Sequence, residues 1–179
     1  MSIGAGKLKD ISDYGSVLLV EEPNSMQETT SAILKKLQDK KVIYIALIRP
    51  HDSVLSRFTA DGVKTDKLFF IDCVTESAGG NVSARKNVLF VREPTDLSGI
   101  SISVQKLAQS ADSSEKWIVL DALRILTIYN KENVVIHFVQ NLLESATRYD
   151  AKTVVLATKG KDQELIKKVS QYFEKVVGF

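Results

Sequence analysis

The sequence predicts an α/β protein in which a mostly parallel sheet is covered by helices on both faces. Short apolar runs rich in β-branched residues alternate with longer segments of helical period, the pattern that produces such a sheet. The first run, SVLLVE at residues 16–21, is apolar at consecutive positions, as in strands buried on both faces. With 179 residues, 44% of them hydrophobic and 26% charged, the chain can form one domain with its own core. We therefore expect residues 1–179 to form a single-domain, three-layer α/β/α sandwich.

Prolines and caps divide the first half of the chain into elements. Pro23 follows the first strand and Pro50 the second, because proline cannot continue the ladder of a central strand. Ser25 is placed to cap the helix after the first strand, whose apolar residues recur at spacings of three and four. The expected elements are strands over residues 16–21, 42–48 and 68–74, with helices starting at residue 25 and spanning 53–60.

The second half continues the alternation after a loop. Residues 75–86 contain two glycines and few apolar side chains, so we expect a mobile loop there, and residues 1–10 as a second flexible segment. Asp96 or Ser98 is expected to cap the next helix. The expected elements are strands over 87–92, 117–121 and 153–157, helices over 96–111, 134–146 and 162–173, and an edge strand over 175–179.

Charge and composition exclude several classes of protein. The 24 basic and 22 acidic residues leave a net charge of +2, too balanced for a polybasic nucleic-acid binder. The single cysteine, Cys73, cannot form an internal disulfide, and no Cys/His spacing typical of a zinc site surrounds it. The sequence holds no signal core and no apolar run long enough for a membrane span. We expect a soluble, cytoplasmic protein without a membrane partner.

Charged residues follow most of the predicted strands, where ligands bind in open α/β sheets. Three cations at strand ends, Arg49, Arg92 and Lys159, are candidate contacts for an anion or an acidic partner, and ordinary surface charge is the alternative. Carboxylates at the same edge offer oxygen ligands for Mg²⁺, or else are solvated acids near a helix N-terminus. These carboxylates are Glu21, Glu22, Glu28 and Asp121.

Three segments together give the chain a resemblance to a known family. They are the opening strand, turn, Thr29-Thr30 and amphipathic helix, then DGVKTDKLFFID at 61–72, then WIVLDALRILTIYN at 117–130. In this order they resemble the KaiC-type branch of the RecA-like ATPases, best known in archaea, over about residues 7–177. The resemblance implies a RecA-like P-loop NTPase fold, although a full RecA-like core is longer than this chain.

The family's phosphate loop, Gly-x-x-x-x-Gly-Lys-Ser/Thr, falls on EPNSMQET at residues 22–29 by this resemblance. Glu22 then stands at the first glycine, Gln27 at the second and Glu28 at the lysine. Losing the glycines restricts the turn, and a carboxylate at the lysine position opposes triphosphate. Two unit charges 4 Å apart interact by about 4 kcal/mol at an effective dielectric near 20. The degenerate loop therefore comprises Glu22, Pro23, Asn24, Ser25, Met26, Gln27 and Glu28.

Other parts of the family's site remain at matching positions. Thr29 stands at the magnesium-contact position with Thr30 beside it, and Asp121 ends a strand where the family has its magnesium-binding acid. A helix cap is the alternative reading of Asp121. The family's catalytic glutamate pair falls around Ile48 and Arg49, so no catalytic residue is named. Thr29, Thr30 and Asp121 are the candidate cofactor-binding residues, and Asp121 is the candidate metal ligand.

The favoured interpretation is a pseudo-ATPase domain that acts as a binding, regulatory or assembly subunit with a protein partner or with further copies of itself. It needs no cofactor, and any ATP or ADP with Mg²⁺ binds weakly. The first alternative is a nucleotide or phosphate-ligand sensor, or a weak ATPase, with a rearranged site. The second alternative is a DNA-associated recombination accessory protein, which the charge balance supports only weakly.

Overall fold

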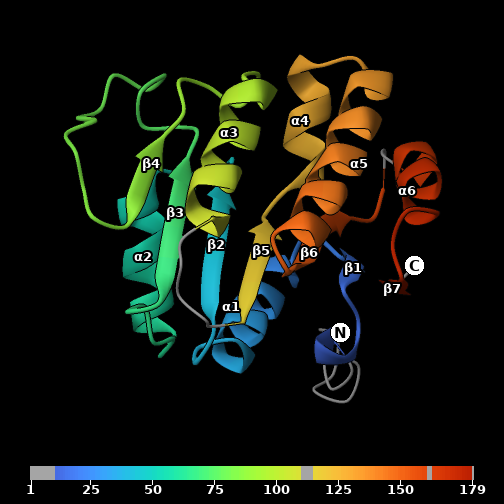
Figure 1. Cartoon of the computed structure of the whole chain (residues 1–179), viewed down its shortest axis with the longest axis horizontal. Coiled ribbons are helices and arrows are strands. Elements are labelled where there is room, and N and C mark those ends of the chain that lie inside the picture. The colour runs from blue at the N-terminus through green and yellow to red at the C-terminus, as the bar shows by residue number, and fades with distance from the viewer. Residues whose placement is uncertain (1–10, 110–114, 161–162, 179) are drawn as a thin grey trace.

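One seven-stranded sheet lies between two layers of helices in the computed structural model (Figure 1), which describes residues 11–109, 115–160 and 163–178. All neighbouring strands run parallel, in the order β4-β3-β2-β5-β6-β1-β7, so the predicted α/β fold with a parallel sheet is confirmed. The strands are β1 (Ser16–Glu21), β2 (Lys41–Ala46), β3 (Leu68–Asp72), β4 (Val88–Phe90), β5 (Lys116–Leu120), β6 (Ala151–Thr158) and β7 (Lys175–Val177).

Helices cover both faces of the sheet, as Figure 1 shows. On one face α1 (Met26–Lys36) and α2 (His51–Ala60) pack against the sheet. The other face is covered by α3 (Leu97–Ala108), α4 (Leu123–Tyr129), α5 (Glu132–Arg148) and α6 (Gln163–Ser170). A short 3₁₀ turn, η1 (Ile11–Asp13), precedes β1.

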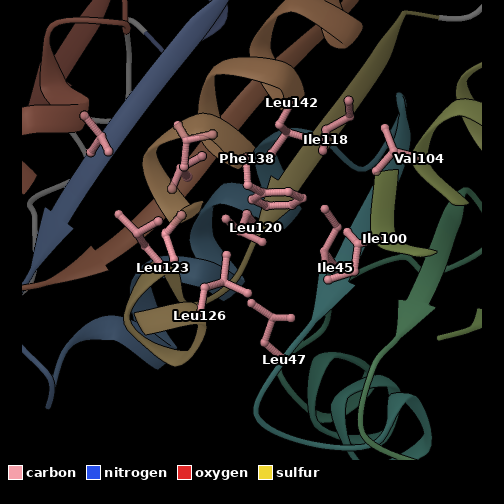
Figure 2. Packing of buried hydrophobic residues seen from close by; sticks show 14 of the residues in the cluster. Ile45, Leu47, Ile100, Val104, Ile118, Leu120, Leu123, Leu126, Phe138 and Leu142 are labelled. Atoms are coloured by element: carbon pink, nitrogen blue, oxygen red, sulfur yellow. The ribbon is translucent and has the colours of Figure 1, made fainter. Parts of the chain in front are cut away.

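The continuous apolar runs arise because successive side chains of a strand serve two separate cores. Val17 and Leu19 belong to the cluster beneath α1 and α2, whereas Leu18 and Val20 belong to the cluster beneath α5 and α6. Figure 2 shows part of the second cluster. Its labelled residues are Ile45, Leu47, Ile100, Val104, Ile118, Leu120, Leu123, Leu126, Phe138 and Leu142.

Strands β2 and β3 end earlier than expected because carboxylates bond the backbone just beyond them. The amide of Leu47 donates to Asp121 Oδ1 at 3.1 Å, and the amide of Val74 donates to Asp72 Oδ1 at 2.9 Å. Helix α4 was not predicted, since Leu123 and Leu126 face the core while Ile128 and Tyr129 are exposed, which obscures a helical period. Residues 1–10, 110–111, 162 and 179, which belong to the expected flexible segment, helices and edge strand, lie outside the described part of the chain.

The caps of the helices partly follow expectation. Ser25 stands at the N-cap of α1, as expected, but its side chain makes no capping hydrogen bond. At α3 the N-cap is Asp96, not Ser98, because its Oδ1 accepts from the Gly99 amide at 2.8 Å. None of the helices that the structure describes is both long and apolar enough to cross a membrane.

Replacing the cap of α3, Asp96→Ala, is expected to lower the free energy of unfolding by about 1 kcal/mol, because the Gly99 amide loses its acceptor. Urea denaturation measures the change. The matched control is Ser98→Ala, since Ser98 is an exposed residue of the first turn, and it should change stability by less than about 0.5 kcal/mol. Equal losses in the two variants would contradict the assignment of Asp96 as the cap.

Candidate functional site

The connection from β1 to α1 is a tight turn of residues 22–25. The resemblance to RecA-like ATPases puts the phosphate loop at this point of the chain. The Ser25 amide donates to the Glu22 carbonyl at 3.0 Å, and the Thr29 amide donates to the Ser25 carbonyl at 3.0 Å. Regular α-helix therefore starts at once, and Gln27 and Glu28 lie in its first turn with exposed side chains. Glu22, Pro23 and Asn24 of the turn are also exposed, while Ser25 is buried.

The two candidate threonines bond within the β1–α1 unit. The Thr29 hydroxyl donates to Glu21 Oε2 at 3.3 Å, and both side chains are buried. The other carboxylate oxygen, Glu21 Oε1, accepts from the Glu22 amide at 2.9 Å. The Thr30 hydroxyl donates to the Met26 carbonyl at 2.7 Å. The Thr29–Glu21 hydrogen bond therefore connects the start of α1 to the end of β1. This buried contact was not predicted from the sequence.

Asp121 follows β5 and is held by the neighbouring strand β2. Its Oδ1 accepts from the Leu47 amide at 3.1 Å, and its Oδ2 accepts from the Tyr44 hydroxyl at 3.2 Å. The N-cap of α4 is Ala122, so the carboxylate does not cap that helix. Burial raises the pKa of Asp121 to about 7, although the two hydrogen bonds and the charge of Arg57 lower it. Burial, together with the Asp121 charge, also raises the pKa of Tyr44 well above its usual value.

A pocket of about 180 Å³ opens beside Asp121, between the starts of α1 and α2. It brings Asp121 and Thr30 together with two arginines, Arg49 after β2 and Arg57 on α2. The remaining lining comes from Pro23, Met26, Gln27, Tyr44, Ile48 and Val54. Pockets for drug-sized ligands have volumes of about 300–1,000 Å³, so this pocket suits a smaller group.

The three candidate cations do not converge on one anion. Arg92 follows β4 and Lys159 follows β6, and the sheet order separates these strands by four positions, or about 19 Å at the usual strand spacing. Lys159 Nζ lies 3.7 Å from Glu22 Oε1 in an exposed ion pair. Of the three, Arg49 lines the pocket beside Asp121. The three cations therefore do not share one anion site, and Arg92 and Lys159 as separate contacts for an anion or an acidic partner stay predictions.

The four carboxylates considered for Mg²⁺ do not form one cluster either. Within residues 11–109, 115–160 and 163–178, no group of three His, Cys, Asp or Glu side chains is arranged to hold a metal ion. Glu22 and Glu28 are exposed, whereas Glu21 and Asp121 are buried. Asp121 as a ligand of Mg²⁺ carried in by a nucleotide stays a prediction.

A second buried cluster, which the sequence did not reveal, surrounds Asp72 at the end of β3. Its carboxylate accepts from the His51 amide at 2.7 Å, the Val74 and Thr75 amides at 2.9 Å, and the Thr75 hydroxyl at 2.6 Å. The His51 ring, only 2% exposed, places Nδ1 2.7 Å from the same carboxylate. Burial alone would raise the pKa of Asp72, but these hydrogen bonds lower it overall. The only signal in the sequence was the position of Asp72 at a strand end.

The loop over residues 75–86 contacts this cluster. Arg85 Nη1 lies 2.8 Å from Asp52 Oδ1 and 3.1 Å from His51 Nε2, so the loop reaches back to the start of α2. The expected loop is present, since residues 75–84 carry no helix or strand. Its mobility stays a prediction.

Comparison with known proteins gives the chain a family. Residues 42–179 match the sequence profile of a family described as a family of unknown function, DUF7090. The chain belongs to the DUF7090 family. No curated protein matches it.

Solved structures similar to this DUF7090 chain include an ATPase domain, a KaiC-like protein and an uncharacterised protein, each 13% identical to it over 91% of its length. The uncharacterised protein PH0321 from Pyrococcus horikoshii, described as in complex with an unknown peptide, has a TM-score of 0.69 with 76% of its chain covered. The KaiC-like protein PH0186 from Pyrococcus horikoshii OT3 has a TM-score of 0.60 with 70% covered. The structure described as an ATPase domain has a TM-score of 0.61 with 68% covered. The DUF7090 chain therefore has the RecA-like fold that the sequence predicted.

Proposed function

We propose that this chain is a pseudo-ATPase domain with a degenerate phosphate loop, acting as a binding, regulatory or assembly subunit. One observation carries the proposal. Only four residues connect β1 to α1, at the place where the phosphate loop of RecA-like ATPases would wrap the phosphates of ATP. Its Glu22–Ser25 backbone hydrogen bond closes a turn, and α1 begins directly after it. This geometry supports a connection that does not enclose a phosphate chain.

The charges around the turn support the same proposal. By the resemblance, Glu28 stands at the position of the phosphate-loop lysine of RecA-like ATPases. Its exposed carboxylate lies in the first turn of α1, where it would repel a triphosphate. By the same resemblance, Arg49 occupies the position of the catalytic glutamates of RecA-like ATPases. Among the residues that line the nearby pocket, Asp121 is the only carboxylate, and both its oxygens accept hydrogen bonds within the protein. No free acid of this lining is placed to activate water.

Exposed apolar side chains support the binding role. Ile102 on α3 is 52% exposed and Val134 on α5 is 42% exposed, and both line a groove of about 440 Å³ between these helices. Ile128 and Tyr129 at the end of α4 are also exposed. Large exposed apolar patches are typical of protein-binding faces, so apolar side chains exposed along a groove support a binding role. The peptide in the PH0321 complex belongs to that protein, and it is a precedent for the proposal that this fold binds a protein segment.

The absence of nucleotide turnover is tested by thermal unfolding with ATP, ADP and Mg²⁺ and by phosphate release. A ligand at 100 times its dissociation constant adds about 2.7 kcal/mol, which shifts the Tm of a domain of this size by several degrees. We expect no ATP-specific shift and no hydrolysis above the protein-free rate. Glu28→Lys is the matched variant, and it should bind nucleotide more tightly than the natural sequence. Hydrolysis by the natural chain would overturn the pseudo-ATPase proposal.

The binding role is tested separately by light scattering after size exclusion and by pull-down. Ile102→Ser and Val134→Ser should weaken self-assembly or partner capture. Val82→Ser removes an equally exposed apolar side chain from the 75–86 loop and should leave both unchanged. A strictly monomeric natural chain that captures no partner would overturn the role.

A further inference from the structure

We propose that His51 is a pH-sensitive switch, in which protonation of the ring at Nε2 displaces Arg85 and releases the far end of the loop over residues 75–86 from α2. This loop connects β3 to β4 at one edge of the sheet (Figure 1). The proposal goes beyond the proposed function, because it requires neither a nucleotide nor a protein partner. It makes the conformation of this edge of the domain depend on pH.

The His51 ring is fixed in position by its neighbours. Nδ1 lies 2.7 Å from Asp72 Oδ2, and the ring centre lies 5.4 Å from that of Phe90 and 6.1 Å from that of Phe70. Burial raises the pKa of Asp72, but the hydrogen bonds that it accepts lower it overall, so this carboxylate is an ionised acceptor at neutral pH. Nδ1 therefore carries a proton in both states of the ring, and Nε2 is the nitrogen that gains or loses one.

Nε2 faces two groups of opposite charge. It lies 3.1 Å from Arg85 Nη1 and 3.1 Å from Asp52 Oδ1, and these two atoms lie 2.8 Å from each other. In the neutral ring the lone pair of Nε2 accepts a hydrogen bond from Arg85. In the protonated ring Nε2–H becomes a donor, and Asp52 is its acceptor. Each protonation state therefore has its own partner for Nε2, which gives the cluster two discrete arrangements.

The protonated ring and Arg85 are incompatible at their observed positions. Both then carry positive charge, with two donor nitrogens 3.1 Å apart, and both use the same acceptor, Asp52 Oδ1. The ring cannot retreat, because it is 2% exposed and packs beside Phe70 and Phe90. The Arg85 side chain is 42% exposed and can turn into solvent. Arg85 is therefore the group that moves.

Arg85 attaches the far end of the loop to α2. All residues from 76 to 86 are exposed. Among the hydrogen bonds of these residues, those of the Arg85 side chain reach α2, whereas the others near the tip stay within residues 74–83. A segment with so few contacts to the rest of the fold opens at little cost once its attachment is lost. Displacement of Arg85 should therefore free the loop.

Three charged groups face the His51 ring, one from each element packed against it. They are Asp72 at the end of β3, Asp52 on α2 and Arg85 in the loop. Ordinary carboxyl groups stay ionised down to about pH 5. Asp121, with a pKa of about 7, also titrates in the range of histidine, but its carboxylate bonds to Leu47 and Tyr44 rather than to this cluster. The experiment therefore includes a variant of Asp121.

Nuclear magnetic resonance of the full chain between pH 8 and pH 5, the range in which histidines ordinarily take up a proton, tests the proposal. The ring C–H shifts report protonation of His51, and ¹⁵N relaxation reports the backbone order parameters of residues 82–86. We expect these order parameters to fall from the rigid range, about 0.85, to the flexible range, below about 0.6. The midpoint of this fall should coincide with the titration of the His51 ring.

Four variants assign the response to the switch. Arg85→Gln should leave residues 82–86 flexible at both pH values, while Lys86→Gln removes the neighbouring exposed charge and should keep the natural response. His51→Gln should abolish the dependence on pH. His137→Gln, which removes an exposed histidine of α5, and Asp121→Asn should both keep it. If His51→Gln does not fold, the exposed pair Arg85→Gln and Lys86→Gln decides.

Several results would overturn the proposal. One is a loop equally ordered, or equally flexible, at pH 8 and pH 5. Another is a change whose midpoint differs from the titration of His51, or that disappears in His137→Gln or Asp121→Asn. A third is an Arg85→Gln protein with the same response as the natural chain.

Discussion

Asp72→Ala is expected to lower the free energy of unfolding by about 3–5 kcal/mol. The substitution removes a fully buried carboxylate and leaves its donors unpaired, namely the amides of His51, Val74 and Thr75 and the Thr75 hydroxyl. It also removes the partner of the His51 ring nitrogen at 2.7 Å. Urea denaturation measures the loss as a shift of the unfolding midpoint to lower urea concentration at an unchanged m value.

Two variants make this expectation specific to the buried carboxylate. Asp72→Asn keeps the shape but replaces one acceptor oxygen by a donor, so it should lose an intermediate amount of stability. Asp66→Ala removes an exposed aspartate from the turn before β3 and should change the free energy by less than about 0.5 kcal/mol. A loss in Asp72→Ala no larger than in Asp66→Ala would refute the role given to the hydrogen bonds.

The same site gives a pH dependence with a defined sign. The pKa of Asp72 is lower in the folded chain than in the unfolded chain, so the unfolded state binds more protons around the ordinary carboxyl pKa. The contribution of Asp72 is fully present above that pKa and is lost as the pH falls through the lower, folded-state value. The stability difference between the natural chain and Asp72→Asn should therefore shrink on acidification below about pH 4.

Asp121→Asn is expected to stabilise the protein at pH 8 by roughly 2–4 kcal/mol. The folded-state pKa of about 7 lies above the ordinary value, so the native state holds the proton more tightly. Stability of the natural chain then falls as the pH rises from about 4 to 7, and the ionised carboxylate is unfavourable above that range. Asparagine carries no charge, and it can accept from the Leu47 amide while donating to the Tyr44 hydroxyl oxygen.

Urea denaturation at pH 5 and pH 8 measures this effect as a difference that grows with pH. Asp66→Asn removes the charge of an exposed aspartate and should show no comparable growth. An Asp121→Asn protein less stable than the natural chain at pH 8 would mean that the ionised carboxylate is stabilising. Adding Mg²⁺ distinguishes a metal ligand, since binding to the carboxylate would stabilise only the natural chain.

Parts of the fold were predictable because they depend on local pattern. The apolar run of β1 and the stripe of α5, which includes Val135, Phe138 and Leu142, are visible in the sequence and are buried as expected. Helix α4 was missed because only Leu123 and Leu126 of its seven residues are buried. The end of β2 was misplaced because a hydrogen bond to the distant Asp121 determines it, and the end of β3 because the Asp72 carboxylate bonds the amide of Val74 just beyond the strand.

The candidate site was predictable only in its position along the chain. The resemblance pointed to residues 22–28 and to Asp121, but not to Arg57 of α2, which lines a pocket with Pro23, Gln27 and Asp121. Arg57 lines the same pocket as Asp121 because α2 follows β2, which lies beside β5. Asp72 meets His51 because β3 lies beside β2, after which α2 begins. Such neighbours follow from the order of strands in the sheet, which a pattern of apolar residues does not encode.

The position of β1 between β6 and β7 has a consequence during synthesis on the ribosome. Ser16 pairs with Thr153, about 140 residues later in the chain, so the first strand emerges long before its partner exists. At 5–20 residues per second, this interval lasts roughly 7–28 s. Throughout it, an apolar strand with both backbone edges open is available to other nascent chains, which is the situation in which holding chaperones act.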